Sequence, residues 1–125
     1  MLFRSMKVII AGGRDFDDYT LLKRKCDELL KDVSDIEIVS GAANGADRLG
    51  ERYAVEKGYP VKQFPADWNR FGNSAGIKRN AEMANYGEML IAFWDGKSRG
   101  TKNMIDVATT KNFRVEIVKY LNTNL

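Results

Sequence analysis

The sequence contains no histidine and only one cysteine among its 125 residues. Without histidine the chain cannot build a Ser-His-Asp or Cys-His catalytic arrangement, a histidine-containing zinc site or an imidazole acid–base group. The lone cysteine, Cys26, cannot form an internal disulfide bond. Any chemistry must therefore use carboxylates, lysine, arginine, hydroxyl groups or backbone amides, and we expect neither a metal site nor a cofactor.

Long apolar runs are also missing from the sequence. No segment approaches the roughly 20 apolar residues that cross a bilayer, and no long apolar segment precedes the first predicted strand. These features predict a cytoplasmic protein with no membrane partner. The composition, 44% hydrophobic and 30% charged, is typical of a globular protein, and the net charge of +3 mildly favours an anionic partner. The length predicts a single domain over residues 1–125.

Short apolar runs alternate with helical patterns along the chain. Strands are predicted at residues 7–11, 36–40, 60–64, 89–94 and 114–120, and helices at 18–33, 46–58, 77–86 and 101–112, with residues 65–76 irregular. Cys26 lies on the apolar stripe of the first helix, which predicts a small core residue. Strands that alternate with helices favour parallel pairing with helical crossovers. We therefore predict an α/β, three-layer Rossmann-like domain with a five-stranded, mainly parallel sheet and helices on both faces.

Parallel sheets of this kind bind ligands beyond the carboxyl ends of their strands, near the point where the strand order reverses. The candidate ligand-binding residues occupy the segments that follow four predicted strands. They are Gly12, Gly13 and Arg14; Ser40, Gly41, Asn44, Gly45 and Asp47; Arg79 and Asn80; and Asp95, Gly96, Ser98, Arg99, Gly100 and Thr101.

The segments after the second and fourth strands both open directly into a predicted helix. Small residues there leave backbone N–H groups uncovered at a helix N-terminus, which attracts anions such as phosphate. The segment after the fourth strand is not a Walker loop, because Thr101 follows Gly100 with no lysine between them. The loop after the first strand, Gly12-Gly13-Arg14, lacks the glycine spacing of the dinucleotide fingerprint. A purely structural reading stays open: Gly41 and Gly45 would permit close packing, and Asp47 would be a stabilising first-turn acid.

Two aromatic residues, Trp68 and Phe71, fall in the predicted irregular segment. They could stack on a base, cover the core or, together with Trp94, form a contact between copies of the chain. A homo-oligomer is one of the partners that the sequence is compatible with.

Five motifs in order resemble the YspA-like, YpsA-related branch of the SLOG superfamily. They are Gly13-Arg14-Asp15-Phe16, Ser40-Gly41-Ala42 with Gly45-Ala46-Asp47 and Leu49, Phe64-Pro65-Ala66-Asp67-Trp68, Arg79-Asn80 with Met83, and Phe93-Trp94-Asp95-Gly96 with Ser98 and Gly100-Thr101. The resemblance implies a Rossmann-like domain that binds nucleotides or nucleotide-derived ligands such as ADP-ribose. Relatives in the wider superfamily include the LOG phosphoribohydrolases and the single-stranded-DNA-binding DNA-processing protein A.

The sequence departs from these relatives at two positions. Met104 stands where the LOG motif has a catalytic glutamate, and Phe71 stands where similar sequences commonly have a histidine. Both departures favour binding over catalysis, although Asp47, Asp95 or Asp106 could replace the missing carboxylate.

Three hypotheses follow from the residues and the resemblance. The first is binding of a nucleotide-derived small molecule, with phosphates on the helix N-termini after the second and fourth strands. The second is hydrolysis of a nucleotide, as a phosphoribohydrolase would do, with Asp95 or Asp47 as general base. The third is binding of single-stranded nucleic acid through basic and aromatic side chains: Arg14, Arg70, Lys78, Arg79, Lys97, Arg99 and Lys102, with Trp68 and Phe71.

Overall fold

The computed structural model describes residues 6–121. The expectation that no apolar leader precedes the first strand falls on residues 1–5, which lie outside the described residues. The strands are β1 (Met6–Gly12), β2 (Ile36–Ser40), β3 (Val61–Gln63), β4 (Met89–Trp94) and β5 (Arg114–Lys119). The helices are α1 (Tyr19–Leu29), α2 (Ala46–Lys57), α3 (Trp68–Phe71), the 3-10 helix η1 (Gly72–Ser74), α4 (Ala75–Tyr86) and α5 (Arg99–Thr110).

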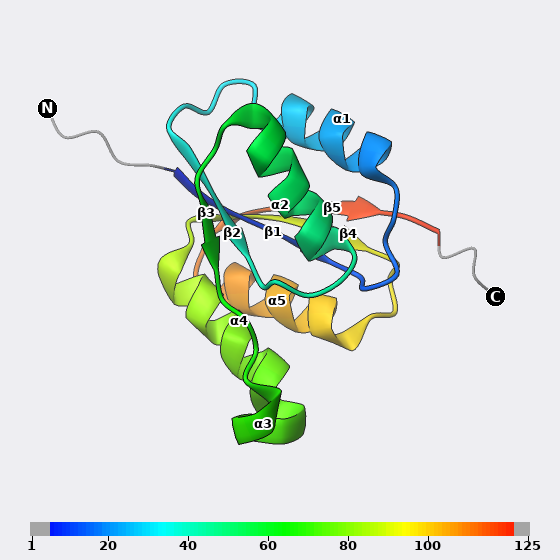
Figure 1. Cartoon of the computed structure of the whole chain (residues 1–125), viewed down its shortest axis with the longest axis vertical. Coiled ribbons are helices and arrows are strands. Elements are labelled where there is room, and N and C mark those ends of the chain that lie inside the picture. The colour runs from blue at the N-terminus through cyan, green and yellow to red at the C-terminus, as the bar shows by residue number, and fades with distance from the viewer. Residues whose placement is uncertain (1–5, 122–125) are drawn as a thin grey trace, which may run out of the picture.

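The strands form one five-stranded sheet in the order β3-β2-β1-β4-β5, and every neighbouring pair is parallel. Helices α1 and α2 cover one face, and α4 and α5 cover the other (Figure 1). The predicted three-layer Rossmann-like architecture is confirmed. The strand order reverses between β1 and β4, because the chain moves outward from β1 through β2 and β3 before it returns to β4 on the other side.

Alternation along the central strand divides the core into two layers. Val8 and Ile10 of β1 pack with α1 and α2, whereas Ile9 and Ala11 pack with α4 and α5. Because both faces are covered, the central strands read as continuous apolar runs. Cys26 is fully buried, as predicted, and burial raises the pKa of its thiol to about 12.

The segment at residues 65–76 is more regular than the sequence predicts. The Asp67 carboxylate accepts a hydrogen bond from the Arg70 amide and caps the start of α3, and Gly72, with a φ of 55°, is the C-cap of α3. Helix α4 then begins at Ala75 rather than at Ile77.

Other predicted helix boundaries are also wrong, and α5 ends at Thr110 instead of Asn112. Helix α1 ends at Leu29 instead of Val33, because Leu30 caps it and the Val33 amide closes a turn onto the Leu30 carbonyl. Helix α5 begins at Arg99 instead of Thr101, because Ser98 is its N-cap. No helix in residues 6–121 is long and apolar enough to cross a membrane.

Candidate functional site

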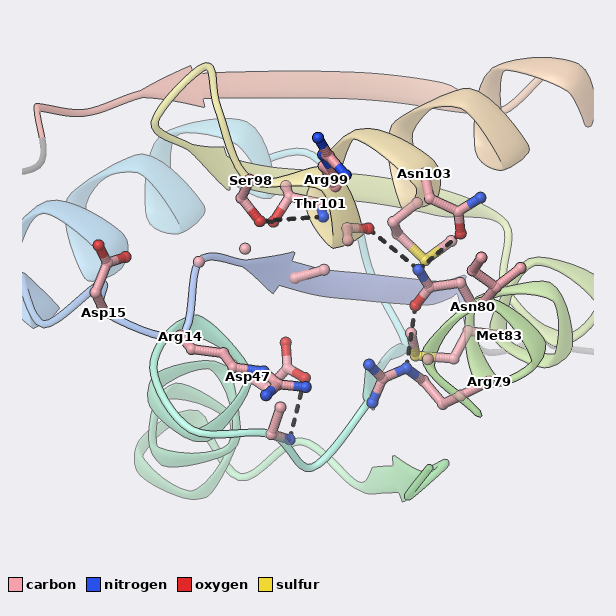
Figure 2. A pocket seen from close by; sticks show the side chains of 18 of the residues that line it. Arg14, Asp15, Asp47, Arg79, Asn80, Met83, Ser98, Arg99, Thr101 and Asn103 are labelled. Carbon is pink, nitrogen blue, oxygen red and sulfur yellow. Dashed lines mark hydrogen bonds between the residues drawn. The ribbon is translucent and has the colours of Figure 1, made fainter. Parts of the chain in front are cut away.

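A cleft of about 550 Å³ lies at the carboxyl ends of β1 and β4, where the strand order reverses. Its volume is within the range of small-molecule sites. The loop after β1 and the start of α2 form one side, and α4 and the start of α5 form the other (Figure 2). Eleven predicted site residues line it: Gly12, Gly13, Arg14, Asp47, Arg79, Asn80, Asp95, Ser98, Arg99, Gly100 and Thr101.

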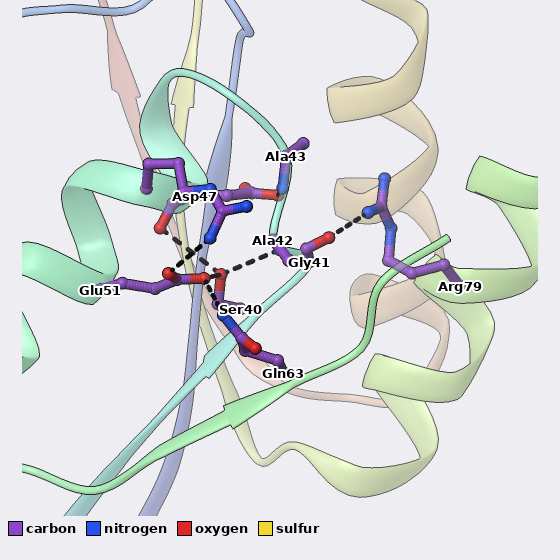
Figure 3. A network of polar contacts seen from close by, with 9 residues as sticks. Ser40, Gly41, Ala42, Ala43, Asp47, Glu51, Gln63 and Arg79 are labelled. Atoms are coloured by element: carbon purple, nitrogen blue, oxygen red, sulfur yellow. Dashed lines mark hydrogen bonds and ion pairs between the residues drawn. The ribbon is translucent and has the colours of Figure 1, made fainter. Parts of the chain in front are cut away.

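The other five predicted residues, Ser40, Gly41, Asn44, Gly45 and Gly96, do not line the cleft. Ser40 is buried under the loop after β2, where its hydroxyl donates to Glu51 Oε2 at 2.6 Å and accepts from the Ala42 amide at 3.0 Å. Figure 3 shows that this network joins the end of β2 to α2. Ser40 thus supports the shape of the loop, and direct ligand contact by these five residues stays a prediction.

Gly45 has a structural requirement to be glycine. Its φ is +81°, and a Cβ there would lie 2.3 Å from the Gly13 carbonyl oxygen. The same carbonyl accepts a hydrogen bond from the Ala46 amide at 3.1 Å, so the loop after β1 rests on the N-terminus of α2. The packing explanation for this glycine therefore accounts for the observed geometry.

The loop that leads into α5 is held in shape by its own side chains. Asp95 Oδ1 accepts hydrogen bonds from the backbone amides of Lys97 and Ser98, both at 2.8 Å. These two bonds hold the pKa of Asp95 below its usual range. A carboxylate so stabilised in its charged form is a poor general base near neutral pH.

The N-terminus of α5 faces the cleft with free donors. Ser98 caps the helix through the Thr101 amide, whereas the Arg99 and Gly100 amides have no hydrogen-bond partner within residues 6–121. Gly100 does not have a positive φ, and a Cβ on it would meet no protein atom within 4 Å. Glycine is unfavourable within a helix. Its presence here leaves the backbone open to close approach from the cleft.

Asp47 is the buried charged group of the cleft, with 5% of its surface exposed. Its Oδ2 accepts a hydrogen bond from the Ala43 amide at 3.2 Å. Burial raises the pKa of Asp47 to about 6, although the Ala43 amide and the charges of Arg79 and Arg14 oppose the shift. Asp47 is therefore partly ionised in the range where general bases operate.

Arg79 and Asn80 connect the elements around the cleft. Arg79 Nη1 donates to the Gly41 carbonyl at 2.7 Å, and its Nε donates to Asn80 Oδ1 at 3.0 Å. Asn80 Nδ2 in turn donates to the Gly100 carbonyl and to Asn103 Oδ1. These bonds join the loop after β2, α4 and α5, and they fix the distance across the cleft.

Ten further residues, both apolar and polar, complete the lining, and the sequence did not identify most of them as site residues. The missed positions are Ala11, Asp15, Ala43, Asn73, Gly76, Ile77, Met83, Asn103 and Met104, while Trp68 was predicted as an aromatic contact. Asn103 follows Gly100 by three residues, so helical spacing could have identified it. The guanidinium of Arg14 lies 5.3 Å from the centre of the Trp68 ring.

The chain is a Rossmann-like α/β protein with a cleft at the switch point of a parallel sheet. The sequence model of the YspA, cpYpsA-related SLOG family matches residues 6–71. Gene 61 protein of Mycobacterium phage D29 is 35% identical over 104 residues, which cover 78% of this chain and 83% of that protein. The chain therefore belongs to the YspA, cpYpsA-related SLOG family, and the resemblance drawn from its motifs is confirmed.

A solved structure shares the fold. DNA processing protein A from Helicobacter pylori, described for its single-stranded DNA binding mode, matches with a TM-score of 0.67 and 18% identity. The match covers 95% of this chain and 67% of that one. At this level of identity the likeness shows the architecture alone.

Proposed function

We propose that the cleft binds a nucleotide or nucleotide-derived small molecule, with a phosphate group at the N-terminus of α5. The observation that carries this proposal is the open backbone at Gly100, beside the unpartnered amides of Arg99 and Gly100. Unpaired donors and the helix dipole together favour an anion at such a position. ADP-ribose, a nucleotide derivative that contains phosphate groups, is a more specific candidate ligand.

The rest of the lining supports a ligand with an apolar part. Trp68 and Ile77 are 47% and 58% exposed and contribute to the cleft, and Met83 and Met104 form its buried apolar wall. Large exposed apolar groups next to a polar site favour a ligand with a flat or apolar surface. A nucleobase against this wall and a phosphate on α5 would use both parts of the cleft.

Calorimetric titration with AMP, ADP-ribose and NAD tests the proposal. We expect at least one of them to bind, and we expect Arg99→Ala to weaken binding about tenfold because it removes a charge-assisted contact. Lys111→Ala is the matched control, since it removes a positive charge from the opposite end of α5. No binding by any of the three ligands, or equal affinities for Arg99→Ala and wild type, would contradict the proposal.

Hydrolysis of a nucleotide is a second candidate, favoured by the raised pKa of Asp47. Asp47 would accept a proton from water as the water oxygen attacks the ribose C1′ and the base leaves with the electrons of the C–N bond. The same proton would then pass to the departing base, so that the products are ribose 5-phosphate and neutral adenine. Chromatographic detection of free adenine from AMP measures this activity. Asp47→Asn should abolish the release of adenine, whereas Asp95→Asn should preserve it. A wild-type protein that releases no adenine would exclude this candidate.

Single-stranded nucleic acid is a further candidate partner because the related fold is described with single-stranded DNA. Of the basic residues predicted for this role, Arg14, Arg79 and Arg99 line the cleft. An oligonucleotide would bind more tightly than AMP, and its affinity would fall steeply with salt. Equal affinities for AMP and the oligonucleotide would exclude this candidate.

A further inference from the structure

Only one of the two oxygens of the Asp47 carboxyl group accepts a hydrogen bond in the described part of the chain. Oδ2 accepts from the Ala43 amide, and Oδ1 has no hydrogen-bond partner within residues 6–121. No side-chain oxygen in those residues is both fully buried and unpartnered. Because Asp47 is 95% buried and lines the cleft, the remaining open surface of its carboxyl group faces the cleft (Figure 2).

The neighbouring charges do not satisfy this carboxyl group. Arg79 Nη1 donates a hydrogen bond to the Gly41 carbonyl and Arg79 Nε donates one to Asn80 Oδ1. The guanidinium of Arg14 lies against the Trp68 ring. Neither arginine forms an ion pair with Asp47 within 4 Å in the described part of the chain. A buried carboxylate without enough donors is costly to keep. A donor from a ligand would supply the missing hydrogen bond.

The other two carboxylates of the lining are already held. Asp15 Oδ1 accepts from the Tyr120 hydroxyl at 2.7 Å, and Asp95 Oδ1 accepts from two backbone amides. Both residues are also more exposed to solvent than Asp47. Asp47 is therefore the carboxylate of the cleft that gains most from a ligand donor.

We infer that Asp47 is a specificity-determining residue that accepts a hydrogen bond from a ribose hydroxyl, so that the cleft prefers ribonucleotides to deoxyribonucleotides. The inference rests on the proposed function, because it assumes a nucleotide in the cleft. Asp47 stands at the start of α2 on one side of the β1 end, and the proposed phosphate position at α5 lies on the other side (Figure 2). A ribose 5′-phosphate carries its phosphate on the C5′ arm and its hydroxyl groups on C2′ and C3′ of the ring, so it can bridge these two sides.

The size of the preference follows from the burial of Asp47. A site built to hydrogen-bond a hydroxyl group rejects the analogue that lacks it, because the protein group is then left desolvated and unpaired. We expect AMP to bind at least about tenfold more tightly than one of its two deoxy analogues, 2′-deoxy-AMP and 3′-deoxy-AMP.

Calorimetric titration of the full chain with AMP and with both deoxy analogues tests this inference at pH 7.5, where Asp47 is ionised. Asp47→Asn keeps the shape of the side chain but halves its accepting capacity, and it should bring the three affinities to within about threefold. Asp47→Ala, a second variant, should do the same. Asp32→Asn is the matched control, since it is exposed in the turn after α1, at the opposite edge of the sheet; it should retain the wild-type preference.

The outcomes separate this inference from the proposal on which it rests. Equal affinity of wild type for AMP and both analogues overturns the inference alone, because a nucleotide then binds without recognition of its hydroxyl groups. A preference that persists in both Asp47 variants also overturns it, since another group then reads the sugar. Absence of AMP binding to the folded wild-type protein overturns the proposed function, and the inference falls with it.

Discussion

Two helices begin at the same edge of the sheet, and their N-termini differ in what they offer a ligand. Helix α2 follows β2 and carries its own anion, the Asp47 carboxylate, which already binds the Ala43 amide. Helix α5 follows β4 and leaves the amides of Arg99 and Gly100 without a partner. The sequence makes both starts look like phosphate sites. The structure favours phosphate at α5 and a hydrogen-bond donor at α2, because a second anion beside Asp47 would be repelled.

The largest effect on stability should come from Gly45, which lies directly before α2 and packs against the loop after β1. Gly45→Ala would force a Cβ into contact with the Gly13 carbonyl at a φ of +81°. We expect the free energy of unfolding to fall by about 3 kcal/mol, from backbone strain and overpacking together. Urea denaturation measures the loss. Gly100→Ala is the control on the α5 side and should not lower stability, because its Cβ meets no protein atom and alanine is more favourable than glycine in a helix. Equal losses for the two variants would remove the distinction between the helix starts.

The next effect concerns the Asp47 carboxylate at the start of α2. Its replacement should raise the free energy of unfolding instead of lowering it. Burial raises the pKa of Asp47 from its ordinary 3.8 to about 6, so the folded protein binds this proton more tightly than the unfolded chain. The Asp47 contribution to stability therefore falls as the pH rises from about 4 to 6, and it stays unfavourable above that range.

Asp47→Asn should consequently increase the free energy of unfolding at pH 7 by about 1–3 kcal/mol and have little effect near pH 4. Urea denaturation at both pH values, with Asp32→Asn as the exposed control, measures this difference. A variant that is less stable than wild type at pH 7 would show that the α2 carboxylate supports the fold, and the contrast with α5 would lose its basis.

The smallest effect should come from the loop that shapes the α5 start. Asp95→Ala removes the acceptor for the amides of Lys97 and Ser98, and we expect a loss of about 1–2 kcal/mol in the free energy of unfolding. Asp95→Asn keeps an acceptor oxygen and should lose less. If both variants match wild type in a denaturant titration, the α5 loop does not depend on this carboxylate for its shape.

The sequence predicts the fold well because the fold depends on patterns that are local. The run at residues 8–11 is apolar throughout, as a strand covered on both faces requires, and Gly12 ends β1 next to it. Boundaries were less accurate where a side-chain cap decides them. Ser98 adds two residues to the start of α5, and Asp67 turns part of a predicted loop into α3.

The candidate site was predicted in part. The loops that follow the strands indicate which residues lie at the carboxyl edge of the sheet, but they do not indicate which side chains point into the cleft. Ser40 and Asp47 occupy the same motif, yet Ser40 lies under the loop with Glu51, and Asp47 lines the cleft. Apolar wall residues such as Ile77 and Met83 come from helix faces, and their place in the cleft depends on how α4 packs.

The most direct test of the contrast between the two helix starts is an amide-resolved NMR titration of the protein with AMP. The account predicts that the largest amide shifts occur at Arg99 and Gly100, whose N–H groups gain a phosphate partner. The amides of Ala46 and Asp47, at the start of α2, should shift less. Larger shifts at Ala46 and Asp47, with none at Gly100, would contradict the assignment of the phosphate to α5.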